Sequence, residues 1–157
     1  MISIIIPTYN RGYTLSQVLD SYYRQKFVKE LIIVDDGGSD DTASVVDRFS
    51  RRYPQIKTVY LKNEKRKGAP YSRRRGLLAA QGEFILFGDD DDFLEENYTE
   101  VCLSKLKSLS ASVVSGRHFF RNPVESVDEA IARFGPGWTD APPFDYRLFY
   151  IKMEARF

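Results

Sequence analysis

Short apolar runs alternate with segments of helical spacing over the first hundred residues. Residues 2–6 are mostly β-branched isoleucine, which predicts a buried strand that ends at Pro7, because proline has no N–H to donate. Thr14 and Gln17 have the spacing of a capping box, and we expect a helix from there to about Gln25. Its apolar positions repeat at helical spacing: Leu15, Val18, Leu19 and Tyr22.

The same alternation continues along the chain. Strands are predicted at residues 30–34, 58–61 and 83–87. Helical faces are predicted between them, at Val45, Val46 and Phe49, and at Leu77 and Leu78. Pro70 suits the first turn of the second of these helices, and Gly82 follows its end. Alternating strands and helices predict an α/β domain with a mostly parallel sheet and helices on both faces.

Beyond residue 93 the pattern is weaker. A helix is predicted at residues 98–109, with Val101, Leu106 and Leu109 facing inward. A fifth strand could form at residues 112–115, and a final helix at residues 144–153. The intervening residues 116–143 are rich in turn formers.

Length and composition exclude several classes of protein. The 157 residues, 43% of them hydrophobic, suit a single compact domain, and the formal net charge of +1 gives no general attraction to nucleic acid. A lone Cys102 and a lone His118 cannot make a disulfide or a zinc site, so both are expected to be packing residues. With no signal peptide and no apolar run of about 20 residues, we expect a cytoplasmic protein without a transmembrane segment. Peripheral contact with a membrane stays open.

Two acidic turns follow predicted strands. Four consecutive carboxylates, Asp89–Asp92, raise one another's pKa unless a cation neutralises them, and carboxylates without histidine or cysteine suit Mg²⁺ or Mn²⁺. Asp35 and Asp36 follow a neighbouring strand, and ligands bind at the carboxyl ends of parallel strands. The alternative is that both turns are solvated helix caps.

A basic segment lies between the third and fourth predicted strands. Its cations are Lys62, Lys65, Arg66, Lys67, Arg73, Arg74 and Arg75. Such a segment is usually a solvated face. Cations in the first turns of a helix gain nothing from its dipole, however, which favours phosphate binding by at least one of them.

Four segments together resemble the family 2 glycosyltransferases. They are Ser3–Arg11, Ile33–Thr42, Gly68–Gly76 and Ala80–Asp92, in the order and spacing of that family. The resemblance covers about residues 1–94, a donor half, and leaves residues 95–157 as an abbreviated acceptor half of one domain. It implies a GT-A fold and inverting transfer from a nucleoside-diphosphate sugar, with uridine favoured. This chain departs from the family pattern at Gly38, Arg74 and Gly88.

The resemblance also implies roles for single residues. The donor would lie against Pro7, Thr8, Tyr9, Arg11, Asp35, Asp36, Arg73, Asp89 and Asp90. Pro7, Thr8 and Tyr9 would line the base and ribose. Asp36 would accept a hydrogen bond from the base, and Arg73 would face the donor. Asp91 would hold the metal, Asp89 would meet the ribose or the metal, and Asp90 would take the middle position of the D-x-D motif.

The reaction also needs a general base for the acceptor hydroxyl. By partial resemblance to the family we expect Asp145, with Asp140 as second choice; a helix N-cap is the alternative for Asp145. The expected function is metal-dependent transfer of a sugar from a nucleoside-diphosphate sugar to a hydroxyl of a glycan, lipid or protein. The alternatives are a nucleotidyltransferase acting on sugar phosphates and a non-catalytic nucleotide-sugar-binding module. Nucleic-acid binding through the basic segment ranks last.

Overall fold

The computed structural model describes residues 1–108 and 150–152 of the chain. Four helices and five strands occur in these residues. In chain order they are β1 (Ile2–Thr8), α1 (Gly12–Tyr23), β2 (Val28–Asp35), α2 (Thr42–Arg52), β3 (Lys57–Lys62), α3 (Ala69–Ala79), β4 (Phe84–Phe87), α4 (Tyr98–Ser108) and β5 (Tyr150–Lys152).

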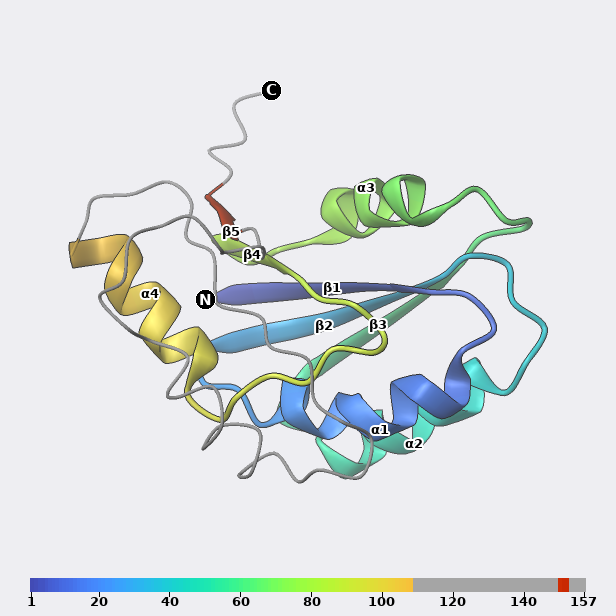
Figure 1. Cartoon of the computed structure of the whole chain (residues 1–157), viewed down its shortest axis with the longest axis horizontal. Helices are drawn as coiled ribbons and strands as arrows, with labels where there is room; N and C mark the ends of the chain where they lie inside the picture. Colours follow the sequence, from blue (N-terminus) through green and yellow to red (C-terminus); the bar gives the residue numbers. More distant parts are fainter. Residues whose placement is uncertain (109–149, 153–157) are drawn as a thin grey trace, which may run out of the picture.

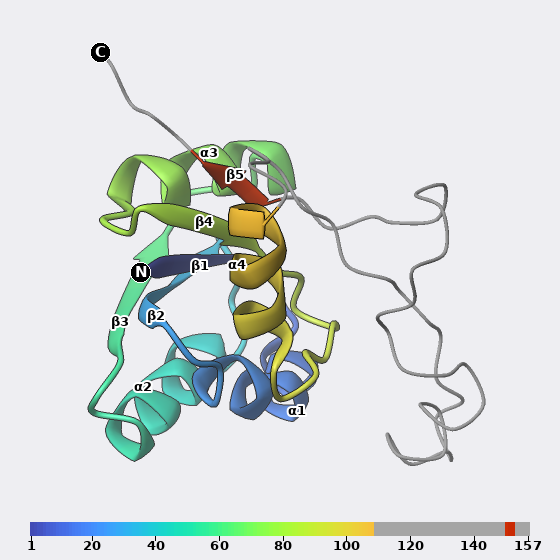
Figure 2. The same ribbon diagram turned by 90° about the vertical axis from the view of Figure 1, so that its left-hand side faces the viewer.

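The strands form one sheet in the order β3-β2-β1-β4-β5. The first four are parallel, and β5 pairs antiparallel with β4. Helix α3 covers one face, while α1 and α2 cover the other (Figures 1 and 2). The predicted α/β architecture, with helices on both faces of a mostly parallel sheet, is confirmed. None of the helices within residues 1–108 is long and apolar enough to span a membrane.

Strand β1 lies in the middle of the core because both of its faces are covered. Ile2, Ile4 and Ile6 pack with the residues of α1 and α2, whereas Ile5 packs on the side of α3. This alternation follows from the two-residue period of a strand, and burial on both faces explains why the strand is mostly isoleucine.

The prediction that β1 ends at Pro7 is wrong, since pairing with β2 continues through Pro7 and Thr8. The backbone of Ile5 faces β4 and accepts a hydrogen bond from Gly88 N at 2.9 Å. Pro7, two residues on, faces the same side, where pairing with β4 has already ended at Ile5. Its missing N–H therefore costs no ladder hydrogen bond, which is the arrangement in which a strand tolerates proline.

The capping-box prediction for α1 is also wrong. The helix begins two residues before Thr14, at Gly12, and has no side-chain cap of its own. Instead Gly12 N donates to Asp40 Oδ2 at 2.8 Å, and Asp40 Oδ1 accepts from Thr42 Oγ1 at 2.6 Å. Asp40 thus accepts hydrogen bonds from the first residues of both α1 and α2. Burial would raise the pKa of Asp40, but these donors outweigh it, so the pKa lies below its ordinary value.

The expected helix at residues 144–153 is wrong at Tyr150–Lys152, which form β5 against β4. Pairing with the open edge of β4 satisfies backbone groups that sequence periodicity does not reveal. In α4, Leu106 and Cys102 are buried as predicted, whereas Val101 is only half-buried. Leu109, His118 and the strand expected at residues 112–115 lie outside the described residues.

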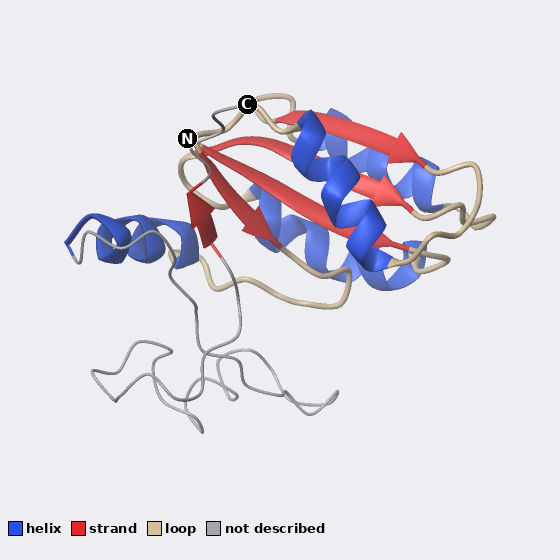
Figure 3. Ribbon diagram, turned by 90° about the horizontal axis from the view of Figure 1, so that it is seen from above, coloured by secondary structure: helices blue, strands red, loops and turns tan. Residues whose placement is uncertain are grey.

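Glycine 76 allows α3 to lie close to the sheet, above β1 and β2 (Figure 3). A Cβ atom there would lie 2.4 Å from Ile5 Cγ2 and 3.3 Å from Val34 Cγ2. The side chains of Ile5 and Val34 are both fully buried. Position 76 therefore sets the distance between the helix that carries Arg73 and the strands below it.

We expect Gly76→Ala to lower the free energy of unfolding by about 1–3 kcal/mol, because the added methyl group has no space in a closely packed core. The measurement is urea unfolding followed by circular dichroism. Leu78→Ala on the same helix is the control, since Leu78 is 65% exposed and its truncation should change stability by less than about 0.5 kcal/mol. Equal stabilities of the two variants would contradict the close packing.

Candidate functional site

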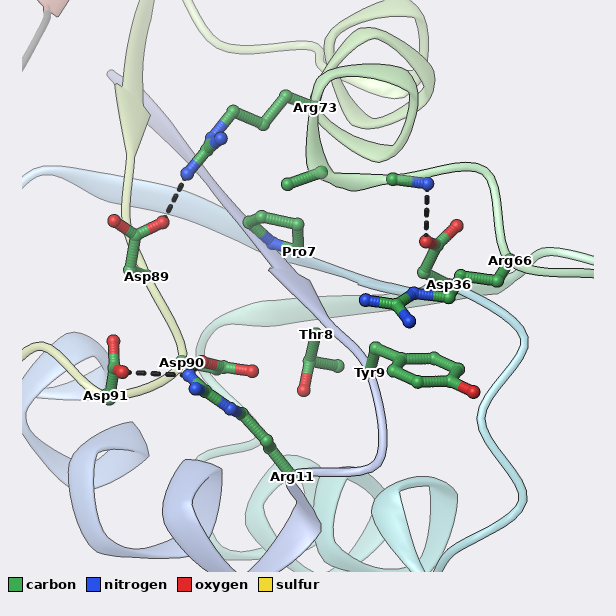
Figure 4. A pocket seen from close by; sticks show the side chains of 12 residues that line it. Pro7, Thr8, Tyr9, Arg11, Asp36, Arg66, Arg73, Asp89, Asp90 and Asp91 are labelled. Carbon is green, nitrogen blue, oxygen red and sulfur yellow. Dashed lines mark hydrogen bonds and ion pairs between the residues drawn. The ribbon is translucent and has the colours of Figure 1, made fainter.

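A pocket lies at the carboxyl ends of β1, β2 and β4, beside the first residues of α3 (Figure 4). Its volume is about 420 Å³, within the range of small-molecule sites. The chain runs outward from β1 to β2 and β3 and then returns to β4 on the other side of β1, so the pocket lies where strand order reverses. The lining residues are Pro7, Thr8, Tyr9, Arg11, Asp36, Arg66, Gly68, Ala69, Arg73, Asp89, Asp90 and Asp91.

Nearly all of the described residues expected at the site line this pocket; the exception is Asp35. Its Oδ1 accepts from Gly38 N at 2.7 Å and its Oδ2 from the Tyr60 hydroxyl at 2.6 Å. A Cβ atom at position 38 would lie 2.9 Å from Asp35 Oδ1, which explains the glycine at this departure from the family pattern. Asp35 therefore shapes the turn below the pocket. Asp140 and Asp145 lie outside the described residues.

Asp36 organises the loop between β3 and α3. Its Oδ1 accepts from Asn63 Nδ2 at 2.7 Å, from Lys67 N at 2.9 Å and from Ser72 Oγ at 3.2 Å. Its Oδ2 accepts from Gly68 N at 2.7 Å. Burial by itself would raise the pKa of Asp36, but these donors outweigh it and hold the pKa below its ordinary value. Because a carboxylate oxygen has two lone pairs, Oδ2 keeps capacity for one more donor on the pocket side.

The same loop places Arg66 over Tyr9. The Arg66 guanidinium lies 4.4 Å from the centroid of the Tyr9 ring, a cation–π contact between the two pocket walls. Gly37, with φ +81, packs against the backbone of Lys65 and Arg66. This contact holds the part of the loop that carries Arg66. The sequence placed Arg66 only within a basic segment; its position two residues before Gly68 was the one signal that could have singled it out.

Two arginines neutralise the acidic turn after β4. Arg11 Nη1 donates to Asp90 Oδ1 at 2.9 Å and to Asp91 Oδ2 at 2.8 Å, and Arg73 pairs with Asp89. The hydrogen bond to Asp90 and the negative charge of Asp90 raise the pKa of Arg11 above its ordinary value. Asp91 contributes in the same two ways. The sequence predicted a cation for these carboxylates, and among the described residues the cations beside them are guanidinium groups.

The acidic turn is supported from below by Tyr22. A Cβ atom at Gly88 would lie 2.6 Å from Tyr22 Cε1, and the Tyr22 hydroxyl donates to the Asp89 carbonyl at 3.0 Å. Glycine at position 88, another departure from the family pattern, thus makes room for a tyrosine ring. The ring in turn holds the backbone of the turn.

Two carboxylates of the acidic turn are accessible to a divalent metal. The side chains of Asp89 and Asp91 are 47% and 52% exposed, whereas that of Asp90 is 8% exposed. Within residues 1–108 and 150–152, no three His, Cys, Asp or Glu residues are grouped so that they could hold a metal ion. Two accessible carboxylates suit Mg²⁺ or Mn²⁺, which complete their shell with phosphate oxygens and water.

Thr8 presents a buried polar atom to the pocket. The residue is 4% exposed, and its Oγ1 has no hydrogen-bond partner among the residues that the structure describes. Buried hydroxyl groups are nearly always hydrogen-bonded, so this hydroxyl needs a partner that the described residues do not supply.

A parallel sheet with a carboxylate-rich and arginine-rich pocket at its switch point defines an α/β protein with a candidate ligand site at the carboxyl ends of its strands. Residues 3–155 match the family model described as Glycosyl transferase family 2. The chain belongs to this family.

Three bacterial relatives illustrate the similarity. The glycosyltransferase GlyG of Streptococcus pneumoniae is 29% identical over 120 residues, which are 76% of this chain and 39% of that protein. The GalNAc(5)-diNAcBac-PP-undecaprenol beta-1,3-glucosyltransferase of Campylobacter jejuni is 39% identical over 94 residues, 59% of this chain and 30% of that protein. WfgD of Escherichia coli is a UDP-Glc:alpha-D-GlcNAc-diphosphoundecaprenol beta-1,3-glucosyltransferase. It is 33% identical over 133 residues, which are 84% of this chain and 51% of that protein.

Solved structures agree on the fold. Staphylococcus aureus TarS 1-349 in complex with UDP-GlcNAc is 27% identical with a TM-score of 0.70, covering 80% of this chain and 36% of that chain. The mannosyltransferase PcManGT of Pyrobaculum calidifontis, solved with GDP-Man and Mn²⁺, has a TM-score of 0.66 and is 22% identical, covering 96% of this chain and 44% of that chain. At this identity the likeness shows the fold alone. The predicted GT-A fold is confirmed. This chain spans about half or less of the length of the relatives and structures described here.

We expect Asp36→Asn to lower the free energy of unfolding by about 2–3 kcal/mol at pH 7, because an amide cannot accept from all the donors around the carboxylate. Since the pKa of Asp36 is lowered in the folded state, its contribution is complete above the ordinary value near 3.9 and is lost as the pH falls through the folded-state pKa. The stability gap between the native chain and the variant should therefore narrow from pH 6 to pH 3 in urea unfolding.

The control is Glu64→Gln, an exposed carboxylate in the same loop. Its substitution should leave both the stability and the pH dependence close to those of the native chain. A gap for Asp36→Asn that stays constant down to pH 3 would contradict the lowered pKa.

Proposed function

We propose that the chain transfers a sugar from a uridine-diphosphate sugar to an acceptor hydroxyl, with inversion and with Mg²⁺ or Mn²⁺. The observation that carries this proposal is the polarity of the pocket. One end has the Tyr9 ring, Asp36 and Arg66, and the other has the acidic turn with its two arginines (Figure 4). An aromatic residue beside a hydrogen-bond acceptor suits a nucleobase, and the arginines at the other end of the pocket suit a diphosphate.

Each part of the donor then has a partner. The base lies against Tyr9 and donates its N–H to Asp36 Oδ2, and the ribose lies beside Thr8. The diphosphate meets Arg73 and Arg11 at the other end. Uridine is supported by the UDP-GlcNAc of the TarS structure and by the UDP-Glc in the description of WfgD.

A metal would be held by Asp91 and Asp89, and when bound it would neutralise the charge that develops on the leaving diphosphate. Arg73 adds to that stabilisation from the side of α3. Asp145, assigned by resemblance, would take the proton from the acceptor hydroxyl as it attacks the opposite face of the sugar. The acceptor is proposed as a hydroxyl of a glycan, a lipid or a protein, and the relatives include transferases that act on lipid-linked sugars.

We expect UDP with Mn²⁺ to raise the melting temperature by about 5–10 °C at a ligand concentration 100 times the Kd, because ligand that binds only the folded state stabilises it by about 2.7 kcal/mol. A thermal-shift panel of UDP, GDP, ADP and their sugars, with and without Mn²⁺, checks this. Asp91→Asn should remove the metal-dependent part of the shift. Asp47→Asn, on the exposed surface of α2, is the control and should keep it. If no nucleotide gives a metal-dependent shift, the donor class is wrong.

We expect Asp145→Asn to lower the rate of transfer by about 10²–10⁴-fold while UDP-sugar affinity stays unchanged, because an amide cannot take up the proton. Transfer is measured with a radiolabelled UDP-sugar and a panel of hydroxyl acceptors, and Asp140→Asn serves as the comparison. Native-like turnover of Asp145→Asn would refute its assignment. Release of UDP supports glycosyl transfer, whereas release of pyrophosphate would indicate the nucleotidyltransferase, and binding without turnover of donor would indicate the non-catalytic module.

A further inference from the structure

Arg11 holds two adjacent carboxylates of the acidic turn with one nitrogen. Its Nη1 lies 2.9 Å from Asp90 Oδ1 and 2.8 Å from Asp91 Oδ2. Arg73 reaches the turn from the other side of the pocket and, among the described residues, pairs with Asp89. Figure 4 shows the two guanidinium groups approaching the turn from opposite walls. Arg11 is thus the cation placed at the carboxylate that the proposed function gives to the metal.

A guanidinium and a divalent cation compete for this position. Both are positive, so a metal on Asp91 is repelled by a guanidinium that stays within 3 Å of the same carboxylate. The Arg11 side chain is 53% exposed, follows the end of β1 and already lines the pocket. A diphosphate entering the pocket offers Arg11 oxygens of the same kind as those that it leaves.

We propose that Arg11 couples metal binding to nucleotide binding. In the empty pocket Arg11 occupies Asp90 and Asp91 and weakens the binding of a divalent metal alone. The diphosphate draws Arg11 away from these carboxylates, so the metal binds more tightly when the nucleotide is present. By linkage, the metal strengthens nucleotide binding by the same factor. This inference rests on the proposed function, because it assumes a nucleoside diphosphate in the pocket.

A purely structural role for Arg11 makes the opposite prediction. If Arg11 only ties the acidic turn in place, removing it loosens Asp91 and weakens the binding of metal alone. If Arg11 competes with the metal, removing it frees Asp91 and tightens that binding. The sign of the change in Mn²⁺ affinity, measured without nucleotide, therefore separates the two roles.

The experiment measures Mn²⁺ binding to the full chain by calorimetry and by electron paramagnetic resonance of free Mn²⁺, with and without saturating UDP. For the native chain we expect UDP to tighten Mn²⁺ binding by about 5–150-fold, the usual range of coupling between sites. For Arg11→Gln, Mn²⁺ alone should bind about 3–10-fold more tightly than to the native chain, and the tightening by UDP should shrink by the same factor. Arg11→Lys keeps the charge and should lie between the two.

Arg24→Gln is the matched control. Arg24 lies just after α1, is 61% exposed and pairs with Asp20, so its substitution removes one positive charge outside the pocket. Mn²⁺ binding by Arg11→Gln that equals that of Arg24→Gln, or is weaker, would overturn the inference. If Arg11→Gln does not fold, Arg11→Lys decides by the same sign. A native chain that binds neither UDP nor Mn²⁺, alone or together, would overturn the proposed function and this inference with it. If the native chain binds UDP in a metal-dependent way but the Arg11 variants bind Mn²⁺ with native affinity, only this inference is overturned.

Discussion

The crowding of carboxylates at one end of a parallel sheet governs the arrangement of this domain. Consecutive aspartates occur at the end of β2 and shortly after the end of β4, and the β2–α2 turn adds Asp40. Like charges at such spacing are tolerated only when each has a partner. The structure provides two kinds of partner. Asp36 and Asp40 are held largely by backbone N–H groups and neutral side chains, whereas Asp89, Asp90 and Asp91 are held by arginines.

This division separates permanent contacts from exchangeable ones. Backbone donors in turns cannot leave without unfolding the loop, so Asp36 and Asp40 fix the geometry of the pocket walls. A half-exposed guanidinium loses little when it moves from one anion to another, because surface ion pairs contribute little net stability. The acidic turn therefore keeps its charge available for a ligand, while the walls around it stay in place. Gly76 and Gly88 serve the same purpose, since each lets a rigid neighbour approach closely.

The sequence predicted the sheet well and the ends of its elements less well. Apolar periodicity defines which face of a segment is buried, and that signal is strong in β1 and α2. The start of α1 depends on Asp40, a residue 28 positions away from Gly12, and β5 depends on the open edge of β4; neither partner is visible to a local pattern. In the site, the motifs identified the residues that meet in the pocket. They did not reveal that Asp35 turns away from it, because the direction of a side chain within an acidic pair is set by tertiary contacts.

The order of the strands leaves β3 at one margin of the sheet. Its first and last residues are lysines, and both are tied to carboxylates of β2: Lys57 Nζ lies 3.2 Å from Glu30 Oε2, and Lys62 Nζ lies 3.8 Å from Asp35 Oδ2. A foreign strand that added to β3 would have to bury or displace these charges before it gained any backbone pairing. The edge strand β3 is therefore a poor template for aggregation. Domains should not associate through this edge at the high concentrations needed for crystallisation or NMR.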